Sequence, residues 1–193
     1  MQLKCLKYPL QPYWEQCQRG EELKEMSNSW KRPKIKIVKT KSEWIWDFIG
    51  YSFYFGSLIF LIYNWKGLPD EVPAHYNALG EVDRWGSKME LFILPIVGAI
   101  SALFMQLFEK FPESHNYPER LSKENVKEFY LISRKLVNQL KNICLIIFAL
   151  ILIESVSIAL GMGNGFGVWF LPIAILCALI PIVLGIIKQK KIR

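Results

Sequence analysis

Four side chains with metal-binding chemistry lie within nine residues of one another. The four are His75, Asn77, Glu81 and Asp83. A turn at residues 78–80 would fold the two acidic residues back, and carboxylate, amide and imidazole groups together can ligate a cation. The alternative is a compact turn in which the Asn and Asp side chains satisfy their own backbone. The spacing leaves both interpretations open.

Glu154 is a second candidate, because it interrupts the apolar run LIIFALILIESVSIAL. An acidic residue at the centre of a membrane span costs about 3 kcal/mol, which argues against a lipid-facing position. We therefore expect Glu154 to face the interior at the level of Ser57 and Gly98, where small residues leave room. One interpretation is a buried proton or cation site, which would suit a small transporter or channel component. The other is a protonated carboxyl group bonded to Ser57 or to a carbonyl, with a packing role only.

Enzymatic chemistry has little support in the sequence. It contains no c-type haem motif, HExxH, P-loop or dinucleotide fingerprint. A metal-dependent enzyme would need several convergent ligands, and His75 is the one obvious nitrogen donor in this loop. We expect a non-enzymatic protein without a cofactor.

The elements that must position these residues are four apolar stretches at 45–63, 91–108, 143–160 and 168–187. A span needs about 20 mostly apolar residues, and soluble core helices rarely run this long without a charge. The sequence therefore predicts an all-α integral membrane protein, a four-helix bundle of four spans. Between the first two spans, Gly, Pro and Asn residues predict an ordered, non-helical outer loop.

Lysines and arginines alternate from rich to poor along the segments outside the spans. Residues 1–44 hold ten, 109–142 hold seven and 188–193 hold four, whereas 64–90 hold three and 161–167 hold none. The positive-inside rule places the amino and carboxyl termini and the second loop in the cytoplasm. The net charge of +7 then reflects this bias and the attraction to anionic headgroups of the lipid bilayer, with no nucleic acid partner implied.

Three segments follow from this organisation. Residues 1–42 form a basic cytoplasmic tail, 43–187 the four-span membrane domain and 188–193 a second basic tail. Residues 1–25 lack an apolar run, so one interpretation is a mis-annotated start with the chain beginning at Met26, and the other is a genuine tail. The four cysteines, which we expect to be reduced, are Cys5, Cys17, Cys144 and Cys177.

The inner face carries two further expectations. A helix is expected after Ser122, with a basic amphipathic surface that either lies along the inner leaflet or docks a cytoplasmic protein partner. Four basic residues of this helix lie outside its apolar face: Lys127, Arg134, Lys135 and Lys141. Asp47, near the start of the first span, is expected to be a solvated acid at a helix start.

The loop and the second span also carry a dense signature between residues 67 and 95. Its residues are Leu68, Pro69, Pro73, His75, Asn77, Gly80, Asp83, Gly86, Lys88 and Pro95. This segment resembles a bacterial membrane domain-of-unknown-function family that also forms the amino-terminal part of SdpI-type immunity proteins. The segments RPKIKI and NYPERLSKENVKEFY are similar to stand-alone members of that family.

The resemblance implies a multi-pass protein of the bacterial plasma membrane. It also implies a toxin-immunity or signalling role of the SdpI type, in which a peptide toxin or small ligand is met at the outer face. The transporter interpretation based on Glu154 remains the alternative.

Overall fold

The computed structural model describes residues 32–192. By its internal contacts the chain divides into two units, Met1–Lys34 and Ile35–Arg193, and the second unit contains all the helices and strands of residues 32–192. The predicted start at Met26 and the cysteines Cys5 and Cys17 lie outside the described residues.

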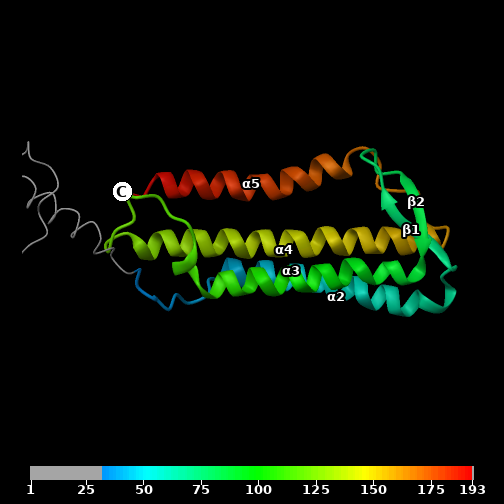
Figure 1. Cartoon of the computed structure of the whole chain (residues 1–193), viewed down its shortest axis with the longest axis horizontal. Helices are drawn as coiled ribbons and strands as arrows, with labels where there is room; N and C mark the ends of the chain where they lie inside the picture. Colours follow the sequence, from blue (N-terminus) through cyan, green and yellow to red (C-terminus); the bar gives the residue numbers. More distant parts are fainter. Residues whose placement is uncertain (1–31, 193) are drawn as a thin grey trace, which may run out of the picture. The chain divides into compact units, whose positions relative to one another are not determined.

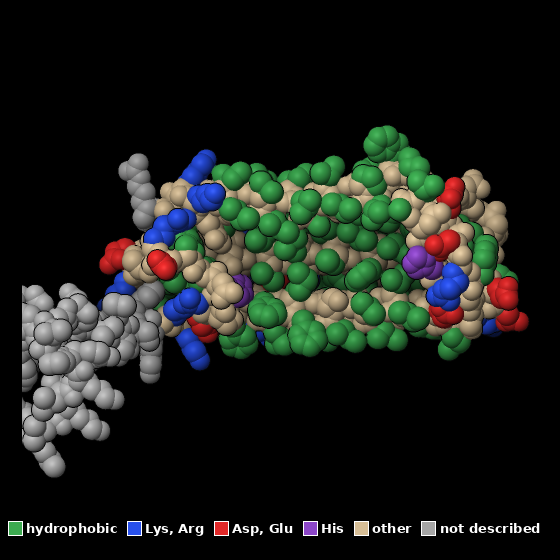
Figure 2. Space-filling model, turned by 45° about the horizontal axis from the view of Figure 1, so that its top comes forward, with side chains coloured by type: hydrophobic (Ala, Val, Ile, Leu, Met, Phe, Trp, Pro, Cys, Tyr) green, Lys and Arg blue, Asp and Glu red, His purple; other side chains and the backbone are tan. Residues whose placement is uncertain are grey.

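Each of the four apolar stretches forms a helix. These are α2 (Lys41–Asn64), α3 (Ile93–Lys110), α4 (Val126–Ala159) and α5 (Phe170–Lys190). All four are long and apolar enough to cross a membrane, which confirms the prediction of a mostly helical, multispanning protein. Figure 2 shows hydrophobic side chains over the middle of the visible face and charged side chains gathered at its two ends. That distribution matches a hydrocarbon layer flanked by headgroups.

Helix α4 is one continuous helix of 34 residues that contains both the basic segment after Ser122 and the third apolar stretch. At 1.5 Å per residue it is about 50 Å long, so about 20 Å extends beyond a hydrocarbon core of about 30 Å. It begins at Val126, later than predicted, because the Asn125 side chain accepts a hydrogen bond from the Ser122 backbone N–H (2.8 Å) and shapes the turn before the helix.

Helix α4 is also the centre of the packing. It contacts α2, α3 and α5, and in Figure 1 α5 runs along the side of α4 away from α2 and α3. Only 6% of the apolar window of α5 is buried. The shared core is therefore formed by α2, α3 and α4, whereas α5 exposes apolar side chains nearly all round, as a lipid-facing helix does.

The loop between α2 and α3 contains a two-stranded antiparallel sheet, so the fold is not purely α-helical. Strand β1 (Glu71–Tyr76) pairs with β2 (Val82–Ser87). The short 3-10 helices η1 (Trp65–Gly67) and η2 (Lys88–Phe92) connect this hairpin to α2 and α3. Gly, Pro and charged residues interrupt the alternation of apolar residues that identifies strands in a sequence.

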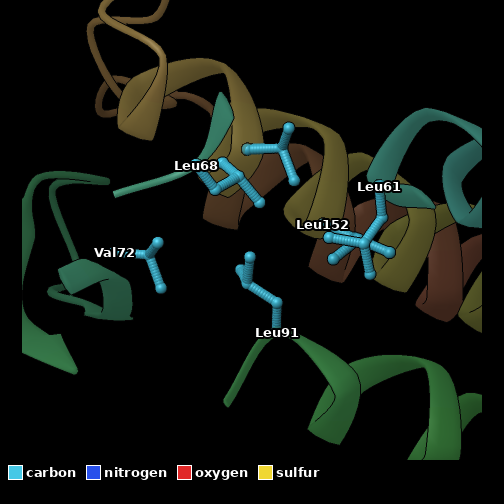
Figure 3. Packing of buried hydrophobic residues seen from close by; sticks show 6 residues of the cluster. Leu61, Leu68, Val72, Leu91 and Leu152 are labelled. Atoms are coloured by element: carbon cyan, nitrogen blue, oxygen red, sulfur yellow. The ribbon is translucent and has the colours of Figure 1, made fainter. Parts of the chain in front are cut away.

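A buried apolar cluster joins the hairpin to the helices. Figure 3 shows Leu61, Leu68, Val72, Leu91 and Leu152 converging from α2, the hairpin, η2 and α4. Each is at most 6% exposed. Because these side chains leave water or lipid only when the hairpin is docked, the cluster holds the hairpin against the end of the helices.

Candidate functional site

Asn77 shapes the turn of the hairpin. Its Oδ1 accepts hydrogen bonds from the backbone N–H groups of Leu79 (2.9 Å) and Glu81 (3.0 Å). Its Nδ2 donates to Glu81 Oε2 (2.9 Å). Gly80 closes the turn in the left-handed region, with φ of 77°. The Asn77 side chain thus satisfies the backbone of its own turn, which is a common use of asparagine.

His75 and Asp83 face each other across the hairpin. Their Nδ1 and Oδ1 atoms are 2.6 Å apart, so the carboxylate fixes the orientation of the ring. The His75 side chain is 64% exposed, which leaves Nε2 accessible to a ligand. The pairing register is irregular on both sides of His75.

The four residues proposed as cation ligands form two separate pairs, His75 with Asp83 and Asn77 with Glu81. Among residues 32–192, no group of three or more His, Cys, Asp or Glu side chains lies close enough to hold a metal ion. The fold therefore does not bring all four side chains together around one cation. The physical reason is that Asn77 and Glu81 serve the turn itself.

A cavity of about 600 Å³ lies beneath the hairpin. This cavity is called the hairpin pocket below, and its polar and apolar lining residues are called its rim and its floor. The rim contains His75, Asn77, Arg84 and Glu90, and the floor contains Leu94, Ile151, Phe166, Phe170 and Leu171. Its volume falls within the usual range for small-molecule sites, and its walls come from the hairpin and three of the helices.

Two polar contacts stabilise the walls of the hairpin pocket. Arg84 Nη2 lies 2.9 Å from Glu90 Oε2, which ties β2 to η2. The Tyr76 hydroxyl and Ser155 Oγ are 2.8 Å apart, which ties β1 to α4. Burial raises the pKa of Tyr76 above its ordinary value, so the phenol stays neutral at physiological pH. The pocket therefore offers neutral and charged hydrogen-bonding groups above an apolar surface.

Several signature residues hold the hairpin rather than line the pocket. A Cβ atom at Gly86 would lie 2.2 Å from Glu90 Oε1 and 2.9 Å from the Ala74 Cβ atom, so a larger residue there would displace Glu90 and crowd Ala74. The Lys88 backbone N–H donates to the Asp70 carbonyl (3.0 Å), and its Nζ lies 3.2 Å from Asp70 Oδ1. Lys88 thus closes the base of the hairpin.

The glycine-rich segment between α4 and α5 completes the site. The Phe166 N–H donates to the Gly80 carbonyl (3.1 Å), and a Cβ atom at Gly80 would lie 2.6 Å from the Gly167 carbonyl oxygen. Glu154 Oε1 accepts a hydrogen bond from the Gly165 N–H (2.9 Å), and Gly165 has φ of 95°. The Glu154 carboxyl group therefore fastens this turn to the end of α4.

Glu154 and Ser57 are not hydrogen-bonded to each other among the described residues, contrary to one expectation. Ser57 is buried and donates to the Tyr54 carbonyl (2.8 Å) within α2. Glu154 is partly buried and bonds a backbone N–H outside its own helix. A carboxyl group near a helix end can reach the loop that follows the helix. Comparing residues at equal depth in different spans does not reveal such a contact.

The opposite end of the helices holds a buried polar cluster that the sequence reasoning missed. Asp47, expected to be solvated, is 7% exposed. Its Oδ1 accepts from Asn138 Nδ2 (2.8 Å) and Asn142 Nδ2 (2.9 Å) and lies 3.0 Å from Lys141 Nζ. The expectation for Asp47 is wrong because α4 extends far enough to cover it.

Two further ions complete this polar cluster. Lys141 Nζ lies 2.7 Å from Glu109 Oε1, and Lys39 pairs with Asp47 and lies 3.8 Å from Glu109 Oε2. Lys141, predicted on the polar face of a surface helix, is only 1% exposed. The positions 134, 138 and 141 follow one another at helical spacing on a single face of α4. That spacing is the sequence pattern from which a buried row of polar side chains on α4 could have been predicted.

Arg134 fastens the segment before α2 to the same end. Its Nε and Nη2 bond Glu43 at 2.8 and 3.0 Å, a two-point pairing. Its Nη1 and Nη2 also donate to the carbonyls of Ile37 (2.6 Å) and Val38 (2.9 Å). Arg134 is 7% exposed, so it too is buried and does not lie on the polar face of a surface helix that was predicted for it.

Comparisons with known proteins support the resemblance read from the signature in its coarser part. A domain of unknown function, DUF1648, matches residues 53–99, which include the hairpin. An uncharacterised protein of the archaeon Archaeoglobus fulgidus is 35% identical over 75 residues. That match spans 38% of this chain and 39% of the archaeal protein. No solved structure matches the chain.

Proposed function

We propose that this multispanning protein binds an amphipathic ligand in the hairpin pocket at the outer face of a bacterial plasma membrane. The ligand is a peptide toxin or a small molecule, and the protein acts in immunity or signalling in the manner of SdpI-type proteins. In this proposal the protein is a binding protein and catalyses no reaction.

The observation that carries the proposal is the combination of groups in the hairpin pocket. Its rim offers the exposed His75–Asp83 pair and the Arg84–Glu90 pair, and its floor is made of apolar side chains from α3, α4, α5 and the segment before α5. A ligand with one polar and one apolar side can satisfy both at once. Membrane-active peptides have that character because they must be soluble and still enter lipid.

Charge supports the placement of the pocket at the outer face. The segment 64–90, which contains the hairpin, holds three lysines and arginines, whereas residues 109–142 at the other end hold seven. Loops poor in these residues face outward under the positive-inside rule. A secreted ligand would then reach the pocket without crossing the membrane.

The test is a survival assay in which cells expressing the chain are exposed to a panel of secreted amphipathic peptides. We expect protection against at least one peptide and its loss in His75→Ala and Arg84→Gln. Both side chains are exposed, so abundance in the membrane is expected to stay unchanged. Lys66→Ala and Met162→Ala are controls, since both are exposed residues at the same end that do not line the hairpin pocket.

Two results would contradict the proposal. In the first, the unmodified chain protects the cells and the pocket variants protect them as well as the control variants do. The pocket would then not be the binding site. The other is a chain that protects against no peptide and whose pocket binds none of them in detergent solution.

A further inference from the structure

A basic cavity lies at the end of the helices opposite the hairpin. Its volume is about 320 Å³. The lining includes Lys36, Lys39, Gln106, Glu109, Lys110 and Arg134, so four cationic side chains accompany a single carboxylate. This basic cavity is separate from the hairpin pocket, because the two share no residue.

The four cations differ in what they already contact. Arg134 is engaged by Glu43 and by two backbone carbonyls, and Lys39 pairs with Asp47. Lys36 and Lys110 are exposed, and neither has a carboxylate partner within the part of the chain that the structure describes. Two uncompensated ammonium groups thus border a cavity whose deeper cations are held in place.

An aromatic groove adjoins the basic cavity. It has a volume of about 560 Å³ and shares Lys39 and Gln106 with that cavity. Its other lining residues include Trp44, Phe48, Tyr51 and Phe55. Trp44, Phe48 and Phe55 are 64%, 76% and 54% exposed on a helix that is apolar enough to span a membrane. Such side chains face acyl chains when the helix is in a bilayer.

The depth of the two sites is set by helix ends. The basic cavity lies where α2 begins at Lys41 and α3 ends at Lys110, and the groove runs along the first turns of α2. Charged groups at helix ends lie at headgroup level, and the aromatic residues about one to four turns further in lie beside the start of the acyl chains. The basic cavity therefore lies at the depth of a phospholipid headgroup, and the aromatic groove lies at the depth of its acyl chains.

We propose that the basic cavity and the aromatic groove together bind one anionic phospholipid. Its phosphate lies between Lys36 and Lys110, and an acyl chain lies along Phe48 and Phe55. Basic pockets between membrane helices are suited to anionic headgroups because ammonium groups pair with phosphate in a region of low dielectric constant. A soluble phosphate would use the two lysines and leave the exposed aromatic groove without a role.

Native mass spectrometry of the purified full chain tests the proposal. The chain is transferred from detergent with phosphatidylglycerol, phosphatidylcholine or glycerol phosphate. We expect one phosphatidylglycerol molecule to remain bound under conditions that remove phosphatidylcholine, and thermal stability to rise with phosphatidylglycerol. Glycerol phosphate is expected to give neither effect at the same concentration.

Variants connect that binding to the cavity. Lys36→Gln combined with Lys110→Gln is expected to weaken retention of phosphatidylglycerol roughly 30-fold, as the loss of two lysines beside an anionic headgroup predicts. The matched control combines Lys123→Gln with Lys127→Gln, which removes the same charge from exposed positions that do not line the cavity. Phe55→Ala is expected to weaken retention of lipid, whereas the lipid-facing control Ile59→Ala is not.

The outcomes separate the possible sources of phosphate. Equal retention of phosphatidylglycerol and phosphatidylcholine overturns the headgroup assignment. If glycerol phosphate stabilises the chain as much as phosphatidylglycerol does, the cavity is a site for soluble anions. That result overturns the assignment of a lipid ligand. Equal weakening in both pairs of lysine variants shows that net charge alone attracts the lipid, which also overturns the proposed site. All three comparisons include the unmodified chain, so they do not depend on the folding of one variant.

Discussion

Asp47 shows how much one buried carboxylate requires of its neighbours. It is 7% exposed and is contacted by two asparagine amides and two lysine ammonium groups. Burying an ion costs several kcal/mol unless other charges and hydrogen bonds replace water. The polar cluster supplies that replacement from α2, α3 and α4, so it fixes the relative positions of these helices as well as the charge.

We predict that Lys141→Met lowers the free energy of unfolding by about 3 kcal/mol or more, because Asp47 and Glu109 lose the cation between them. Adding Glu109→Gln to Lys141→Met is expected to recover part of the loss, since one uncompensated charge is removed. The measurement is chemical unfolding in detergent. Lys127→Met, at an exposed position on the same helix, is the control. A Lys141→Met variant as stable as this control would show that the ion pairs are not coupled to folding.

Two glycines of α2 allow a second, matched prediction. A Cβ atom at Gly50 would lie 2.3 Å from Asn142 Oδ1, whereas at Gly56 nothing lies within 4 Å. Gly50→Ala is therefore expected to displace the buried Asn142 amide and destabilise the protein by about 1–3 kcal/mol, as overpacking does. Gly56→Ala is expected to be neutral or to stabilise by up to about 1 kcal/mol, because alanine favours helix. The measurement is the unfolding temperature of both variants. Equal changes in the two variants would contradict the close approach of Asn142 to Gly50.

Residue types alone gave a partial view of both sites. The sequence identified His75, Asn77, Glu81 and Asp83 as four polar groups that a turn could bring together, and the structure places His75 Nδ1 2.6 Å from Asp83 Oδ1. It did not identify Arg84 and Glu90 as partners, because nothing in their spacing shows that η2 folds back along β2. For Asp47 and Lys141, helical spacing gives the face of each helix but not which faces meet across the bundle.

Helix boundaries and strands were predictable to different degrees. Seven of the eight ends of the apolar stretches lie within four residues of the corresponding helix ends, because length and hydropathy alone define a span. The exception is α4, where charged residues before position 143 suggested a surface helix. Arg134 and Lys141 are buried ions instead, although Lys127 is exposed, and only tertiary packing distinguishes the two cases. The hairpin strands were missed because Gly, Pro and charged residues obscure their alternation.

His115 makes the connection between α3 and α4 sensitive to acid. Its Nε2 lies 3.0 Å from the Phe108 carbonyl and its Nδ1 lies 2.6 Å from Ser133 Oγ. A carbonyl only accepts, so Nε2 carries the hydrogen and neutral Nδ1 accepts from the serine hydroxyl. Burial lowers the pKa of His115 below its ordinary value, since the charged ring is disfavoured there.

The pH dependence follows from that direction. The stability contributed by neutral His115 is present above the unfolded-state pKa of about 6.5 and is lost as pH falls through the lower folded-state pKa. We predict that the unfolding temperature falls on acidification below about pH 6.5 and that His115→Gln reduces this fall. His75→Gln is the control, because His75 is exposed. Identical pH profiles for the unmodified chain and His115→Gln would show that another group controls the acid response.

At the scale of the whole membrane domain, each end has its own chemistry. The hairpin end presents a pocket with a polar rim, and the opposite end holds buried ions beneath a basic cavity. The apolar middle separates them (Figure 2). In a membrane crossed by these helices, a ligand at one end and a headgroup at the other would each meet a different leaflet. Orientation in the membrane therefore decides which compartment each site serves.

The last prediction concerns that orientation. Ala78 in the hairpin turn and Ser114 in η3 (Pro112–Ser114) are both exposed, at opposite ends of α3. In a background with the four cysteines replaced by alanine, Ala78→Cys is expected to react with a membrane-impermeant maleimide in intact cells. Ser114→Cys is expected to react only after permeabilisation, since its segment is rich in lysine and arginine. The reverse pattern would show an inverted protein and place the hairpin pocket inside, whereas labelling of both residues in intact cells would show that α3 does not cross the membrane.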